Sequence, residues 1–212
     1  SLVKIYFLAR LLDPADFGLF SLTAIALGLS EALTQTGVNL TILQSKHSVK
    51  YFLDTAWVIS IFRGLIIGTL MLIFGLGMQY YFDQSQLLIL TATAAIIPVV
   101  KGFINPFIVV MHKKMLFFQD TMFKLSRLVI EILGAILFGF LLHNAFALVL
   151  GLLLGAIFEV GLSFLVFKTR PRFNYLKSRA QPILENAKFL SISNVFNYLV
   201  ENIDDFLIGK IT

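Results

Sequence analysis

Eight ionisable side chains lie inside stretches of this chain that are otherwise apolar. A charged side chain that faces hydrocarbon near the centre of a bilayer costs about 2.5 to 3.5 kcal/mol. In a membrane these groups must therefore face protein or water, or lie near an interface, and they are the first candidates for chemistry. They are Glu31, Arg63, Lys101, Glu131, Glu159, Glu201, Asp204 and Asp205.

The last apolar stretch carries the most polar helix face. Residues three and four apart share a face of a helix, and two adjacent carboxylates in an apolar span require a cation or a proton. We therefore expect a coupling ion here, Na⁺ or H⁺, with Glu31 as a further ligand, and no other cofactor. The residues of this face and its flank are Ser191, Asn194, Asn197, Glu201, Asn202, Asp204 and Asp205.

Shorter stripes mark the other apolar stretches. Glu131 lies four residues after Arg127, which predicts an ion pair within one helix. Glu159 follows Gly151 and Gly155 at intervals of four, a small-residue seam that predicts contact with a neighbouring helix. Arg63 either extends toward the cytoplasmic interface or serves a cavity. A further face combines Thr91, Ala94, Pro98, Lys101 and Asn105.

Composition places all of these stripes in a membrane. Of the residues, 58% are hydrophobic and 14% are charged, against roughly 45 to 50% and about 25% in soluble domains. A bilayer core needs about 20 apolar residues per helix. We predict an all-α bundle of seven transmembrane helices, the first incomplete over Ser1–Leu12. The others are Phe17–Leu43, Thr55–Phe82, Leu87–Met111, Leu125–Leu142, Ala145–Phe167 and Ala187–Thr212.

The connections between these segments differ sharply in charge. The second, fourth and sixth connections carry twelve Lys and Arg residues, whereas the others carry only Arg10. By the positive-inside rule the basic connections should be cytoplasmic, where they meet anionic lipids rather than nucleic acid. At the first connection Asp13 can cap a helix that begins at Pro14, with Asp16 near the positive end of its dipole.

The longest connection, residues 168–188, is predicted to be a basic linker between helices 1 to 6 (1–167) and a final helix (189–212). It either lies on the membrane surface or acts only as a stop-transfer cluster. The chain starts at Ser1 without a Met and ends just after an apolar stretch, so we expect a fragment. Zero cysteines exclude thiolate chemistry, and no HExxH or phosphate-binding loop is present. We therefore expect no enzymatic activity.

The run Ala9–Gly18, ARLLDPADFG, resembles the opening signature of the oligosaccharide flippase or polysaccharide biosynthesis family. This is the Wzx-type branch of the multidrug/oligosaccharidyl-lipid/polysaccharide exporter (MOP) superfamily. Gly37 with Leu43 and Gln44, the stretch Gly102–Pro106 before Lys113, and Asn202–Lys210 fit the same family in order and spacing. Gln35 stands where the family frequently has Asp, although Glu31 lies one turn earlier.

The resemblance implies a two-lobed, MATE-like bundle of twelve to fourteen helices, of which this chain would be the N-lobe and the first C-lobe helix. It also implies a flippase in the inner membrane for polyprenyl-diphosphate-linked oligosaccharide, the repeat unit of O-antigen of lipopolysaccharide, capsule or exopolysaccharide. Polysaccharide assembly proteins would be further partners. A diphosphate needs cationic partners. The candidates here are Arg63, Lys101 and Arg10, with Asn105 forming hydrogen bonds nearby.

Three alternatives remain open. A passive structural or scrambling bundle would not need the carboxylates of the final helix. A MATE-type multidrug or cation antiporter would prefer acidic groups over Arg63 and Lys101. A membrane lipid-sugar ligase or polymerase would place catalytic residues in a large outer loop, whereas the outer connections predicted here are the three shortest.

Overall fold

The computed structural model describes residues 6–34, 38–45, 47–82, 84–185, 196–197 and 200. Within these ranges the fold is all-α, as predicted, and no strand is present. Four of the described helices are long and apolar enough to cross a membrane, which confirms a polytopic helical bundle. The elements are α2 (Pro14–Thr34), α3 (Val38–Gln44), α4 (Val49–Phe82), α5 (Ser85–Gly102), η1 (Pro106–Ile108), α6 (Val109–Lys113), α7 (Phe117–Leu142) and α8 (Phe146–Val166).

The predicted helix start at Pro14 is confirmed, and Asp16 supplies the side-chain contacts there. Its Oδ2 accepts a hydrogen bond from the backbone N–H of Asp13 at 3.3 Å, the reciprocal half of a capping box. Its Oδ1 accepts a hydrogen bond from the N–H of Ala145 at 3.0 Å. One carboxylate therefore joins the beginning of α2 to the connection that precedes α8.

The predicted span Leu87–Met111 is wrong at its end, because α5 ends at Gly102. The residue before a proline is disfavoured in the helical region, and Asn105, which precedes Pro106, is extended with ψ 113°. The Asn105 Oδ1 accepts a hydrogen bond from the N–H of Phe107 and starts the short helix η1. Asn105 therefore does not continue the helix face of Thr91 and Lys101.

Other predicted boundaries shift for identifiable reasons. The stretch Phe17–Leu43 contains two elements, α2 and α3, and residues 35–37 between them lie outside the described ranges. Helices α4 and α7 begin earlier than predicted, at Val49 and Phe117, because their first turns contain charged residues that an apolar count leaves out. The final segment, Ala187–Thr212, lies almost entirely outside the described residues.

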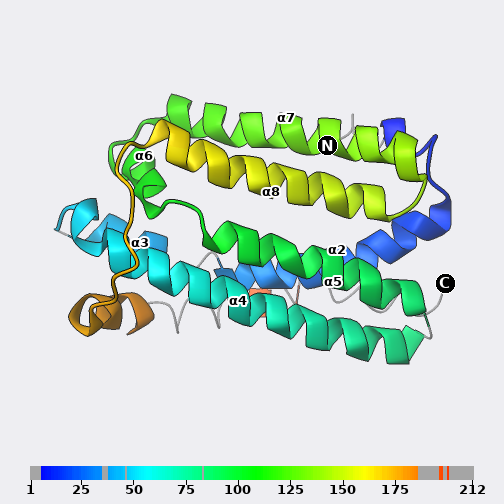
Figure 1. Ribbon diagram of the computed structural model, residues 1–212, viewed down its shortest axis with the longest axis horizontal. Helices are drawn as coiled ribbons and strands as arrows, with labels where there is room; N and C mark the ends of the chain where they lie inside the picture. The colour runs from blue at the N-terminus through cyan, green and yellow to red at the C-terminus, as the bar shows by residue number, and fades with distance from the viewer. Residues whose placement is uncertain are drawn as a thin grey trace.

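Two helical hairpins form the body of the structure (Figure 1). Helix α4 packs along α5, α7 packs along α8, and α5 joins the two hairpins through its contact with α8. Helix α2 packs against α5 and α4. Alternating large and small residues at these contacts place a core between α2, α4, α5 and α8, built around Met71, Leu90, Ala94 and Val149.

Glycines set the spacing within each hairpin. A methyl group added at Gly64 would lie 2.5 Å from the carbonyl oxygen of Pro98, and one added at Gly151 would lie 2.6 Å from Cβ of Ala135. Contacts this short require the absence of a side chain. The predicted packing role of Gly151 and Gly155 is therefore confirmed, and Gly64 has the same role between α4 and α5.

After α8 the chain crosses the ends of the helices as an extended segment and forms a helical turn region at residues 177–185 (Figure 1). We call residues 167–185 the strap. The Arg172 N–H donates to Asp54 Oδ1 at 2.8 Å, and Ile183 is fully buried in a cluster with Ile42, Phe52 and Val109. The basic linker is thus packed against the ends of α3, α4 and α6.

Candidate functional site

The structure brings two of the predicted cationic residues to one level of the bundle. A methyl group added at Gly64 of α4 would lie 3.3 Å from Cα of Gly102 of α5. Because Arg63 and Lys101 directly precede these two glycines, their backbones lie side by side across the α4–α5 contact. Both side chains are partly buried and both interact with other groups of the chain.

Trp57 of α4 holds the end of α5 in place at this level of the bundle. The Trp57 Nε1–H donates to the carbonyl oxygen of Phe103, just beyond the end of α5, at 3.1 Å. The Trp57 ring also contacts Phe103 and Phe164 edge to face. The end of α5 is therefore held against both α4 and α8, which gives Lys101 a defined position.

Asn105 lies close by, and its polar groups form hydrogen bonds within the fold. Its side chain has 0% exposure, and its Nδ2 donates to the carbonyl oxygen of Thr169 at 2.8 Å. Its backbone N–H donates to Ser163 Oγ at 3.1 Å. These bonds connect the end of α5 to α8 and the strap, so the geometry gives Asn105 a structural role.

Arg10 lies at the opposite end of the bundle. Leu8 and Leu12 on either side of it pack against Leu148 of α8, whereas Asn105 contacts Ser163 of that helix. The fifteen residues between Leu148 and Ser163 correspond to about 22 Å at about 1.5 Å per residue. Arg10 is exposed and contacts Tyr6, too far from Lys101 to hold the same phosphate.

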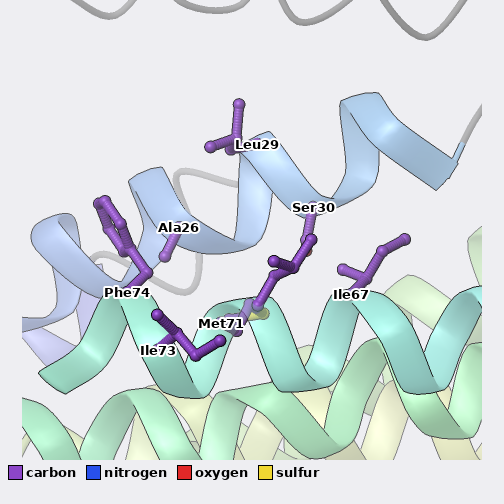
Figure 2. Close-up of a pocket in the computed structure, with 8 residues that line it drawn as sticks. Ala26, Leu29, Ser30, Ile67, Met71, Ile73 and Phe74 are labelled. Carbon is purple, nitrogen blue, oxygen red and sulfur yellow. The ribbon is translucent and has the colours of Figure 1, made fainter. Parts of the chain in front are cut away.

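An apolar cavity of about 300 Å³ lies between α2 and α4 (Figure 2). Its walls are almost entirely hydrocarbon, and the polar exception, Ser30, donates its hydroxyl to the carbonyl oxygen of Leu27 at 2.7 Å. Ile67, at one end of the lining, is one helical turn after Arg63. The lining residues are Ala26, Leu29, Ser30, Ile67, Leu70, Met71, Ile73 and Phe74.

A partly buried ionic group joins α7 to α8. Arg127 Nη2 lies 3.8 Å from Glu131 Oε2, and Arg127 Nε lies 3.5 Å from Glu159 Oε2. The predicted pair of Arg127 with Glu131 and the predicted interhelical role of Glu159 are both confirmed. One cation thus faces two carboxylates, and Glu159 Oε2 is buried without a hydrogen-bond partner.

The predicted ion-coupling residues cannot be placed as a group. Asn194, Glu201, Asn202, Asp204 and Asp205 lie outside the described residues. Asn197 has helical backbone and is exposed. Glu31 belongs to α2, and the structure does not describe its side chain.

Several polar contacts were missed by the sequence reading. Asp120 lies between Lys124, at 2.6 Å, and His112, at 2.9 Å. The spacing of Asp120 and Lys124, four residues apart, was a usable signal for the first contact. Lys113 Nζ donates to the carbonyl oxygens of Ile42, Ser45 and His47. This second contact caps the carboxyl end of α3. No local sequence pattern predicts it, because its partners lie 66 to 71 positions apart in the chain.

The part of the chain that matches a known family includes both hairpins and the strap. A family model described as polysaccharide biosynthesis protein matches residues 7–212. No curated protein and no solved structure matches the chain.

Proposed function

The chain belongs to the polysaccharide biosynthesis protein family, and on this premise we propose that it is a flippase for lipid-linked oligosaccharide. Its cargo is a polyprenyl-diphosphate-linked repeat unit of O-antigen, capsule or exopolysaccharide. The cargo crosses the inner membrane chemically unchanged, by alternating access coupled to Na⁺ or H⁺. Membership of the family gives the role in polysaccharide synthesis or export, and the proposal adds the cargo and the mechanism.

One observation carries the proposal: Arg63 and Lys101 lie at one level, one helical turn from an apolar cavity. A polyprenyl diphosphate combines at least two negative charges with a long hydrocarbon chain. Cationic side chains attract the first through charge-assisted hydrogen bonds, and an apolar cavity accepts the second. Because both cations already interact within the chain, a diphosphate has to replace those interactions.

The orientation of the bundle follows from the distribution of its basic residues. We call the end of the helices that carries the basic connections the basic end. Lys113 caps α3, and Arg179 of the strap donates to the carbonyl oxygen of Tyr51 at 2.9 Å. The second, fourth and sixth predicted connections therefore gather at one end of the helices. In the proposed orientation this end is cytoplasmic, so that cargo is loaded where it is synthesised.

The test replaces each cation by a neutral residue of similar length. Arg63→Gln and Lys101→Gln should each lower oligosaccharide export at least about tenfold, because each removes a charge-assisted hydrogen bond of about 1.5 to 3 kcal/mol. The measurement is the amount of surface polymer and of lipid-linked oligosaccharide retained inside the cell, at equal protein level in the membrane. Lys114→Gln, an exposed position near the basic end, should leave export unchanged.

Two outcomes would contradict the proposal. Normal export by both variants would remove Arg63 and Lys101 from the cargo site. Export that persists after the ion gradient is collapsed would remove the coupling assigned to Asn202, Asp204 and Asp205.

A MATE-type cation antiporter is the second candidate, and the ionic group of α7 and α8 favours it. Arg127 faces two carboxylates, Glu131 and Glu159, and these acidic groups would suit a cationic cargo. Arg63→Gln and Glu159→Gln separate the two functions. A cation extruder should keep its activity in Arg63→Gln and lose it in Glu159→Gln.

A further inference from the structure

A second cavity, of about 380 Å³, lies at the basic end of the bundle. It is lined by residues of α3, the beginning of α4 and the helical part of the strap, residues 177–185. Gln44, His47, Tyr51 and Ser178 supply polar groups to its wall, and Phe52 and Pro182 supply apolar surface. It does not share a lining residue with the apolar cavity between α2 and α4.

The charges around this cavity favour an anion. None of its described lining residues is a carboxylate. The guanidinium carbon of Arg179 lies 4.3 Å from the centre of the Tyr51 ring, so that a cation lies directly beside the wall. The carbonyl groups that end α3 would repel an anion, but the Lys113 ammonium binds three carbonyl oxygens there, at 2.8 to 3.2 Å.

The polar groups of the wall suit phosphate oxygens. The amide of Gln44 and the hydroxyls of Tyr51 and Ser178 are hydrogen-bond donors. Sugar recognition would call for an open aromatic face, whereas the Tyr51 ring already stacks on His47 at 4.8 Å and packs against Arg179. A phosphate group needs only donors and positive charge.

The position of the cavity points to a lipid as the source of the phosphate. The candidate membrane span of α4 begins at Val49, between the lining residues His47 and Tyr51. The span has 33 residues, more than the about 20 that a bilayer core needs, so we infer that its first residues, and the cavity beside them, lie near the lipid headgroups. We propose that it binds the phosphate of an anionic phospholipid in the leaflet at the basic end, and that this lipid holds the strap on α3 and α4. The site is independent of the proposed transport cargo.

The experiment measures lipid binding to the purified protein in neutral detergent by isothermal titration calorimetry. Short-chain phosphatidylglycerol should bind at least about tenfold more tightly than short-chain phosphatidylcholine or inorganic phosphate. Arg179→Gln should weaken phosphatidylglycerol binding about tenfold, the effect of one charge-assisted hydrogen bond. Lys177→Gln is the matched control, because it removes the same charge from an exposed position on the same helix. It should change the affinity less than twofold.

Arg179 also donates to the carbonyl oxygen of Tyr51, so its replacement could loosen the strap. Gln44→Met and Ser178→Ala leave that contact intact and should weaken binding as well, with an unchanged thermal unfolding midpoint. Equal weakening by Lys177→Gln and Arg179→Gln would show diffuse attraction and overturn the site. Binding of inorganic phosphate as tight as that of phosphatidylglycerol would overturn the lipid source. Unchanged affinity in Gln44→Met and Ser178→Ala would exclude this cavity.

Discussion

At the scale of single residues, the most informative feature is that one guanidinium on α7 lies near a carboxylate of α7 and a carboxylate of α8. The side chains of Arg127, Glu131 and Glu159 are 30%, 10% and 13% exposed. Each contact of Arg127 could be predicted separately, from a spacing of four and from a glycine seam. That both carboxylates contact the same guanidinium could not be predicted, because this depends on which faces of the two helices pack together.

Removing the cation of this group should cost more than removing one of its carboxylates. Arg127→Met leaves two carboxylates side by side in a mostly apolar contact, and we expect a loss of stability on the order of 3 kcal/mol. Glu159→Gln keeps the pair of Arg127 with Glu131 and replaces a carboxylate whose Oε2 has no hydrogen-bond partner, so its effect should be small. The measurement is the free energy of unfolding in detergent, from denaturant titration.

The double variant Arg127→Met/Glu159→Gln serves as the control. It should recover part of the stability lost in Arg127→Met, because only one of the two carboxylates that faced Arg127 is left. If Glu159→Gln proved as costly as Arg127→Met, the smaller contribution assigned to the Glu159 carboxylate would be wrong.

At the scale of elements, glycines decide how closely the helices approach. Gly151 and Gly161 lie on the same helix, α8, in opposite surroundings. A methyl group at Gly151 would meet N, Cα and Cβ of Ala135 at 2.6 to 2.7 Å, whereas one at Gly161 would meet nothing within 4 Å. The α7–α8 contact therefore depends on Gly151.

This contrast gives a matched pair of substitutions. Gly151→Ala should destabilise the protein by about 1 to 3 kcal/mol, since helix backbones have to move apart. Gly161→Ala should be neutral or stabilising by up to about 1 kcal/mol, since alanine is the better helix former. Thermal unfolding followed by circular dichroism measures both. A midpoint for Gly151→Ala at or above that of Gly161→Ala would mean that α7 and α8 do not touch there.

Helix ends were the least predictable feature at this scale. Hydropathy carried the fourth predicted span through Asn105 and Pro106, although a local backbone rule ends α5 before them. For α7 the error was in the opposite sense, because Asp120 and Lys124 neutralise each other at 2.6 Å inside the helix. A reading that counts charges singly therefore starts a helix too late wherever such groups are paired.

At the scale of the whole molecule, the sequence predicted the membrane class and the basic end but not the docking of the strap. The contact of Arg179 with Tyr51 joins residues 128 positions apart, and no local pattern contains it. The candidate site shows the same limit. Arg63 and Lys101 were identified one by one, and only the contact of Gly64 with Gly102 shows that they lie at one level.

The orientation of the bundle makes the last prediction, and the absence of cysteine makes it testable. Within these 212 residues a single introduced cysteine is the only thiol. Lys114→Cys and Arg170→Cys mark the basic end, whereas Gln84→Cys and His143→Cys mark the predicted outer end. All four positions are exposed, as thiol labelling requires.

A membrane-impermeant maleimide added to intact cells should label Gln84→Cys and His143→Cys. It should label Lys114→Cys and Arg170→Cys only after the membrane is permeabilised, because basic connections are retained in the cytoplasm. Labelling of each variant after denaturation gives the signal for complete labelling, to which the other signals are compared. The reverse pattern would turn the basic end outward. The strap would then face away from the cytoplasmic leaflet, and cargo could not be loaded at the end of the bundle that the proposed function assigns to it.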